Sequence, residues 1–134
     1  MKFILAPFIA VSLCQLIKMA IAFVSLKEFS WKVVVWESFW AGKFPSGHSA
    51  YIASSLYLLI KYSADPSVHG FAIMVSLLLL YGLLEDKKRH HLLEAHLNLE
   101  MKDLQEFSGH SLTELVAGGF IGVMTTIIFD SVFV

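Results

Sequence analysis

The chain carries little charge and almost no cysteine. Only 16% of its 134 residues are charged, and the lysines and arginines nearly balance the aspartates and glutamates, for a net charge of −1. No field of one sign attracts nucleic acid, and no basic tract is long enough to do so, so we expect no nucleic-acid partner. The single cysteine, Cys14, cannot form a disulfide within the chain. No repeat or low-complexity tract is present.

Apolar residues are abundant instead. They make up 57% of the chain, and the mean hydropathy is +0.69, a balance that is not that of a soluble globular protein. The first apolar stretch resembles a signal peptide, but it is long, contains Gln15 and Lys18, and lacks a small-x-small cleavage site before Lys27. We therefore interpret it as a retained membrane helix. The length predicts a single domain over residues 1–134.

Four apolar segments predict membrane helices. A hydrocarbon core about 30 Å thick requires about 20 helical residues. The segments run from Phe3 to Val24, Ser46 to Tyr62, Val68 to Leu84 and Leu112 to Val134, and the second is short for a full crossing. A turn at Asp65-Pro66-Ser67 separates the second from the third. We therefore expect an all-α, multi-pass membrane helix bundle of about four spanning helices, with the lipid bilayer around it.

Two further segments have a mixed character. From Ser25 to Lys43, tryptophans alternate with charges, which is typical of a membrane–water boundary. From Glu85 to Phe107, leucines recur among charges, which predicts an amphipathic helix outside the bilayer. With four crossings both segments fall on one membrane face. Because most of the cations lie in them, the positive-inside tendency places this face in the cytoplasm, and we expect the protein in the cytoplasmic (inner) membrane.

The first motif is Phe44-Pro45-Ser46-Gly47-His48-Ser49, a turn that leads into an apolar segment. In a purely structural interpretation Ser46 is a helix N-cap and His48 is an ordinary residue of the first turn. In a functional interpretation Ser46 and the Gly47 N–H bind phosphate oxygens, while His48 protonates a leaving oxygen. The motif alone leaves both interpretations open.

The second motif is Gly109-His110-Ser111-Leu112-Thr113-Glu114. Ser111 and Glu114 have the spacing of a capping box, which is a complete structural explanation for Glu114. His110 and Glu114 are also four residues apart, so the carboxylate can hold the far N–H of the imidazole and prepare it to attack phosphorus. The spacing does not decide whether Glu114 has one role or both.

Several cations are candidates for binding phosphate. Lys18 lies some way into a membrane helix, with Gln15 one turn away on the same face. A lysine there is costly, so it is either functional or reaches back to the interface. Lys87, Lys88 and Arg89 form a cluster that could hold phosphate, although such charge runs are usually solvated.

A group of histidines follows this cluster, but we predict no metal site and no cofactor. His90 and Glu94 are four residues apart, whereas His91 and His96 do not share their face at ligand spacing.

The last apolar segment contains Gly118-Gly119-Phe120-Ile121-Gly122, a small-xxx-small pattern. Such a pattern lets another helix approach closely. Since four short helices enclose little space for a lipid, we expect a homodimer packed partly through this face.

Together these motifs resemble the phosphatidic acid phosphatase type 2 / vanadium haloperoxidase superfamily, and more closely its small, divergent acid-phosphatase-related membrane branch. The similarity covers nearly the whole chain in the right order. The branch's Gln-x-x-Lys matches Gln15 and Lys18, its Pro-Ser-x-His-Ser-Ala matches Pro45 to Ala50, its basic pair ahead of Leu-Asn matches Lys87, Lys88 and Leu97-Asn98, and its Gly-His-x-x-x-Glu-Val-x-x-Gly matches Gly109 to Gly118, with Leu115 for Val.

The resemblance implies a metal-independent phosphatase that hydrolyses a lipid phosphate or diphosphate through a phosphohistidine. It implies His110 as the nucleophile, Glu114 as the residue that orients it, and His48 as the general acid. The phosphate-binding residues that it implies are Lys18, Ser46, Gly47 and a basic residue among Lys87, Lys88 and Arg89.

The chain also departs from the superfamily pattern. An Arg-Pro that follows the first lysine is replaced by Ser25 at that spacing, and Asp-x-x-Gly-Val-Arg-Arg is replaced by Leu83-Leu84-Glu85-Asp86-Lys87-Lys88. The departures at the basic motif favour an alternative function, a non-catalytic membrane scaffold or lipid-phosphate-binding protein that retains the pocket, whereas the retained pair of histidines opposes it.

Overall fold

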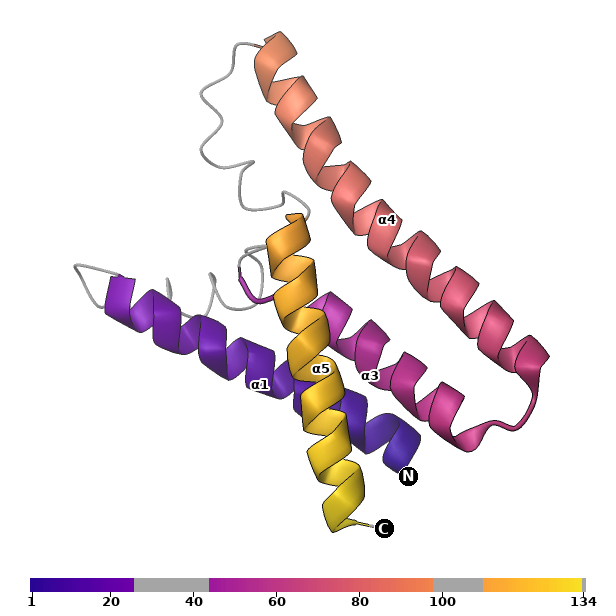
Figure 1. The fold of residues 1–134 in the computed structure, drawn as a ribbon. Helices are drawn as coiled ribbons and strands as arrows, with labels where there is room; N and C mark the ends of the chain where they lie inside the picture. Colours follow the sequence, from indigo (N-terminus) through magenta and orange to yellow (C-terminus); the bar gives the residue numbers. More distant parts are fainter. Residues whose placement is uncertain (26–43, 98–109, 134) are drawn as a thin grey trace.

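The structure is a computed structural model that describes residues 1–25, 44–97 and 110–133. These residues form four α-helices and no strand, so the all-α fold class is confirmed (Figure 1). The helices are α1 (Lys2–Ser25), α3 (Gly47–Tyr62), α4 (Pro66–Leu97) and α5 (Leu112–Val132). Residues 26–43 of the predicted boundary segment, and residues 98–107 of the predicted amphipathic helix, lie outside the described residues.

Three of these helices are long and apolar enough to cross a membrane, by length and composition: α1, α4 and α5. They fit an integral membrane protein. Helix α3 has 16 residues and covers about 24 Å at 1.5 Å per residue, less than a hydrocarbon core of about 30 Å. The sequence predicted about four spanning helices. The described residues form four helices, and three of them are long enough to span.

Helix α4 corrects one predicted boundary. The sequence predicted a membrane helix ending at Leu84 and a separate amphipathic helix after it, but a single helix continues to Leu97. Within α4 no proline or glycine follows Gly82, and an ion pair between Glu85 and Arg89, at 3.6 Å, supports the helix across the expected boundary. The change from apolar to charged residues makes the later part of α4 suited to water, but it does not end the helix.

Helix α1 faces the rest of the bundle along one stripe. Along this stripe every fourth residue of the helix is buried, and all but one of these side chains are small. The stripe consists of Ala6, Ala10, Cys14, Lys18 and Ala22. Because residues four apart lie on one face of a helix, the small side chains let α1 approach α3, where Ala50 packs against Ala10 and Cys14.

Helices α3 and α5 cross with their backbones in contact. A Cβ atom at Gly118 would lie 2.0 Å from the carbonyl oxygen of Ser46, and one at Gly122 would lie 2.2 Å from that of Ala50. The glycine face that we assigned to a homodimer is thus covered within the chain by α3. The homodimer itself stays a prediction, and it would need another surface.

Polar side chains join α1, α3 and α5 at the end of the bundle where both termini lie (Figure 1). Asp130 is 1% exposed. It accepts a hydrogen bond from Tyr62 at 2.5 Å and pairs with Lys61, and it lies 3.4 Å from the ammonium of Lys2. Farther along the α3–α5 contact, Ser54 and Thr126 share a buried hydrogen bond of 2.5 Å. These contacts fix the register of the helices, and hence of the two motifs at their opposite ends.

Candidate active site

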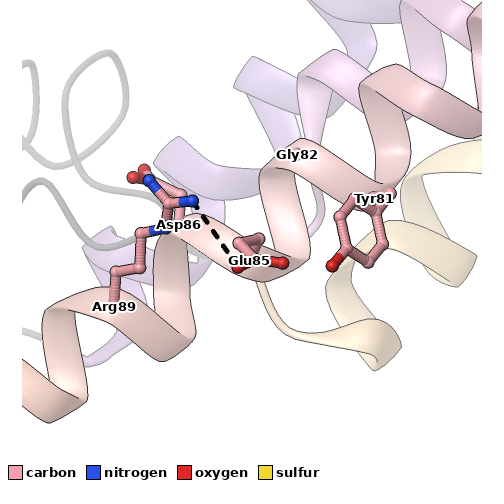
Figure 2. A pocket seen from close by; sticks show the side chains of 5 residues that line it. All are labelled: Tyr81, Gly82, Glu85, Asp86 and Arg89. Carbon is pink, nitrogen blue, oxygen red and sulfur yellow. Dashed lines mark ion pairs between the residues drawn. The ribbon is translucent and has the colours of Figure 1, made fainter.

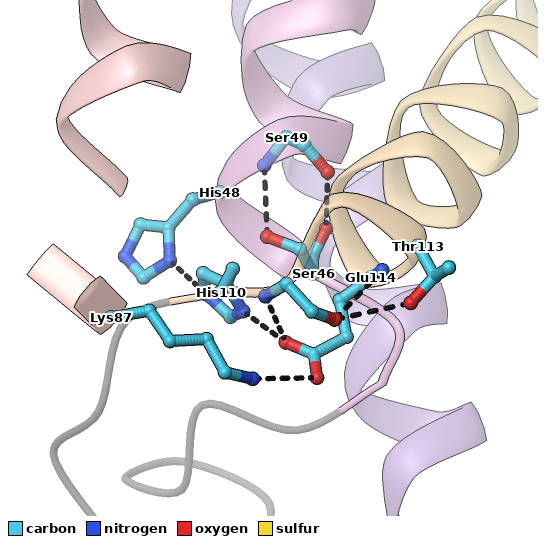
Figure 3. A network of polar contacts seen from close by, with 8 residues as sticks. Ser46, His48, Ser49, Lys87, His110, Thr113 and Glu114 are labelled. Carbon is cyan, nitrogen blue, oxygen red and sulfur yellow. Dashed lines mark hydrogen bonds and ion pairs between the residues drawn. The ribbon is translucent and has the colours of Figure 1, made fainter. Parts of the chain in front are cut away.

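Two histidines from distant parts of the chain meet where α3 and α5 begin. Ser46 caps α3 by accepting the Ser49 N–H at 3.3 Å, which places His48 in the first turn. His110 precedes the cap of α5, and its backbone N–H donates to the carbonyl of Leu83 at 3.1 Å. The Nδ1 atom of His48 lies 3.2 Å from the Nε2 atom of His110 (Figure 3). The expectation that both motifs meet on one side is confirmed.

Glu114 contacts His110 on the side opposite His48. Its Oε2 atom lies 3.2 Å from His110 Nδ1 and also accepts the Ser111 N–H at 3.0 Å. Since an ionised carboxylate can only accept, Nδ1 of His110 carries the proton and Nε2 carries the lone pair. His48 Nδ1 then donates its hydrogen to that lone pair. The three side chains form a chain of hydrogen bonds with a defined direction.

Burial decides the charge of His110, which is only 4% exposed. Removal from water lowers the pKa of its imidazole below the usual 6.5. The neighbouring charges of His48 and Lys18 lower this pKa further, whereas the hydrogen bond to Glu114 opposes them. His110 is therefore neutral at neutral pH, which is the form that can act as a nucleophile.

Lys18 points into the bundle. It continues the small-residue stripe of α1 and is 7% exposed, so its side chain is packed among the helices. Its charge acts on His48, His110 and Glu114, and within the described residues its ammonium makes no hydrogen bond. A buried, unpartnered ammonium beside two imidazoles is suited to receive an anion.

Of the three consecutive cations on α4, Lys87 reaches Glu114, the carboxylate that contacts His110. Its Nζ atom lies 3.6 Å from Oε1 of Glu114 (Figure 3). Lys88 is exposed. Arg89 is 73% exposed and pairs with Glu85. Because successive residues point about 100° apart around a helix, three cations in a row cannot face one site.

Arg89 belongs to a different pocket. This pocket has a volume of about 370 Å³ and is lined by α4 residues (Figure 2). The lining residues are Tyr81, Gly82, Glu85, Asp86 and Arg89. None of the other predicted site residues lines it.

Ser46 is buried at the crossing of α3 and α5. Its hydroxyl caps α3, its N–H donates to the carbonyl of Glu114 at 3.1 Å, and its own carbonyl accepts from the Ser49 hydroxyl at 3.1 Å. The capping role is thus observed. The N–H groups of Gly47 and His48 precede the first intrahelical hydrogen bond of α3, so they are available to a ligand.

Two features of the site had no counterpart in the sequence prediction. The Leu83 carbonyl that holds the His110 backbone leaves no side-chain signal. The inward direction of Lys18 could have been found, since the small residues at every fourth position mark the packed face of α1.

The predicted absence of a metal site concerns His90, His91, Glu94 and His96, whose side chains lie outside the described part of the structure.

A comparison with protein families matches residues 1–125 to a family described as "Divergent PAP2 family". This range contains every predicted site residue, and it confirms the resemblance drawn from the motifs. No curated protein and no solved structure matches the chain.

Proposed function

The chain belongs to the Divergent PAP2 family, and from this premise we propose that it is a metal-independent membrane phosphatase that hydrolyses a lipid phosphate or diphosphate. One observation carries the proposal: Glu114, His110 and His48 are joined in sequence by contacts of 3.2 Å. This arrangement provides an oriented nucleophile with a second imidazole at its reactive nitrogen.

In the first step the lone pair of His110 Nε2 attacks phosphorus. The bond between phosphorus and the lipid oxygen breaks, and the oxygen leaves with the electron pair and takes a proton from the imidazolium of His48. A phosphohistidine and a free lipid alcohol result. For a diphosphate, the leaving group is the lipid monophosphate. Glu114 keeps the Nδ1 proton of His110 in place and stabilises the positive charge that develops on the ring.

In the second step the neutral His48 removes a proton from a water molecule. The water oxygen attacks phosphorus, the bond between phosphorus and Nε2 breaks, and His110 returns to its starting form. Inorganic phosphate is released, and His48 holds the proton needed for the next cycle. The proximity of His48 to Nε2 suits it to act first as the acid and then as the base.

Three groups can hold the phosphoryl oxygens: the ammonium of Lys18, the ammonium of Lys87, and the free N–H groups at the start of α3. The three groups come from three different helices. In the transition state negative charge shifts onto the phosphoryl oxygens, and it develops between these groups. The ion pair between Lys87 and Glu114 keeps this lysine close to the histidines before an anion binds.

The position of the site suits a lipid substrate. His110 lies two residues before Leu112, the first residue of a helix long and apolar enough to cross a membrane. A phosphate at the boundary can reach the histidines while its alkyl chains stay in the bilayer.

The test is a hydrolysis assay on the purified full chain in detergent. A panel of lipid phosphates and diphosphates is supplied in EDTA, and released phosphate is measured. We expect release from at least one lipid, and inhibition by vanadate, which forms a five-coordinate species that mimics the transition state. Lipid phosphate binding without release would instead support the non-catalytic alternative. Loss of activity in EDTA that a metal restores would contradict the metal-independent mechanism.

A further inference from the structure

Gln15 carries a buried polar atom that has no partner among the described residues. Its Oε1 atom is shielded from solvent and accepts no hydrogen bond. The other end of the amide lies beside the first residue of α3, since a Cβ atom at Gly47 would be 3.9 Å from Nε2 of Gln15. Burying an acceptor without a donor costs free energy. A ligand that brings a donor would recover that cost.

The neighbourhood of Gln15 identifies this ligand. One turn along α1 lies the buried ammonium of Lys18, and beside the amide the N–H groups of Gly47 and His48 begin α3. All of these groups donate, so they suit the bare oxygens of an anion. The amide oxygen of Gln15 cannot pair with the bare oxygens of an anion, because all of these oxygens are hydrogen-bond acceptors. It can bind only an oxygen that still carries a hydrogen.

We propose that Gln15 is a specificity-determining residue, and that its Oε1 accepts the hydrogen of a protonated phosphate oxygen. The site would then take a phosphate monoester as its monoanion, which has one P–OH group and two bare oxygens. The inference rests on the proposed function for the location of the phosphate. Sulfate has the same tetrahedral shape but carries no hydrogen at neutral pH, so it would leave Oε1 unpartnered and would bind more weakly.

The test compares inorganic phosphate with inorganic sulfate by calorimetry on the full chain in detergent at pH 6, where the phosphate monoanion predominates. The wild-type protein should bind phosphate about tenfold more tightly than sulfate or better, because sulfate leaves a buried acceptor unsatisfied. Gln15→Leu removes the acceptor and should reduce this ratio to about one. Gln15→Glu keeps an acceptor and should retain the preference for phosphate, even if both anions bind more weakly.

Ser12→Ala is the matched control. Ser12 lies on the same helix, but it is exposed, and its hydroxyl donates to the carbonyl of Phe8 at 2.9 Å. This variant should keep the wild-type ratio. Gln15→Met is a second apolar variant that guards against a fault peculiar to leucine.

Equal binding of the two anions by the wild-type protein, binding of neither, or an unchanged ratio in both apolar variants would overturn the inference. Calorimetry needs no turnover, so the two proposals fail separately. A ratio that depends on Gln15 in a protein that hydrolyses no lipid phosphate would support the role of Gln15 and refute the phosphatase. Turnover with a ratio that ignores Gln15 would do the reverse.

Discussion

Glu114 orients His110 with the same carboxylate oxygen that caps α5. This Oε2 atom lies 3.2 Å from the imidazole Nδ1 and 3.0 Å from the Ser111 N–H, while the Ser111 hydroxyl accepts the Glu114 N–H at 3.4 Å. The spacing of the motif was compatible with either role, and the structure shows that one side chain makes both contacts. Helix stability and the orientation of the proposed nucleophile therefore depend on the same residue.

The two roles of Glu114 can be separated by substitution. Glu114→Gln keeps an oxygen that can cap α5, so we expect its thermal unfolding to match that of the wild-type protein. It loses the negative charge that stabilises the His110 imidazolium, so kcat should fall about 100-fold or more. Glu114→Ala should lose activity and, in addition, about 1 kcal/mol of stability. Equal activity of the Gln variant and the wild-type protein would contradict the orienting role.

Removal of either histidine should stop turnover without unfolding the protein. We expect His110→Ala to abolish phosphate release and His48→Ala to reduce it by about 10²- to 10⁴-fold, since His110 is the proposed nucleophile and His48 the proposed proton donor. Phosphate release and circular dichroism are measured together. If both folded variants turned over at the wild-type rate, the proposed mechanism would be wrong.

Lys87 should matter more than its two neighbours. Lys87→Met removes the cation that lies 3.6 Å from Glu114, and we expect kcat/KM to fall about 10²-fold through lost stabilisation of the phosphoryl oxygens. Lys88→Met and Arg89→Met are matched controls that remove the same charge from exposed positions, and each should stay within about threefold of the wild-type value. A loss of the same size in all three would indicate a general electrostatic effect.

The glycine face of α5 should control folding. Gly118→Ala and Gly122→Ala place a methyl group against the backbone of α3, and each should lower the free energy of unfolding by about 1–3 kcal/mol or more. Gly119→Ala is the control, because a Cβ atom there would lie 3.8 Å from Ala53, an ordinary contact. Thermal unfolding in detergent measures the difference. Variants at Gly118 and Gly122 that kept wild-type stability but lost a dimer would restore the interface first expected from the sequence.

The pH profile should report His110. Since burial lowers its pKa below 6.5, the midpoint of the acid limb of kcat/KM should lie below pH 6.5, and activity should fall as the imidazole is protonated. Lys18→Met removes a positive charge that lowers this pKa, so the midpoint should move up, whereas Glu114→Gln removes a contact that raises it, so the midpoint should move down. NMR of ¹³C-labelled histidine in micelles measures the same shifts without turnover. Shifts of the opposite sign would refute this electrostatic assignment.

The sequence by itself determined the helices and the caps at their starts. Apolar runs of about 20 residues predict α1 and α5, and the caps Ser46 and Ser111 mark where α3 and α5 begin, because capping involves only residues within one turn. The meeting of His48 and His110 also followed from the order of the crossings, since alternate loops return to one face. The caps follow from local sequence and the shared face follows from the number of crossings, and neither depends on how the helices pack.

Only the tertiary structure decided which side chains share the site. The choice of Lys87 among three adjacent cations and the unpartnered oxygen of Gln15 both depend on how each helix is rotated against its neighbours. The same holds for Gly118 and Gly122, whose pattern predicts a close helix partner but cannot identify α3 as that partner. A helix sequence specifies which residues share a face and can mark a face suited to close packing. Which other helix meets that face is set by packing between distant segments.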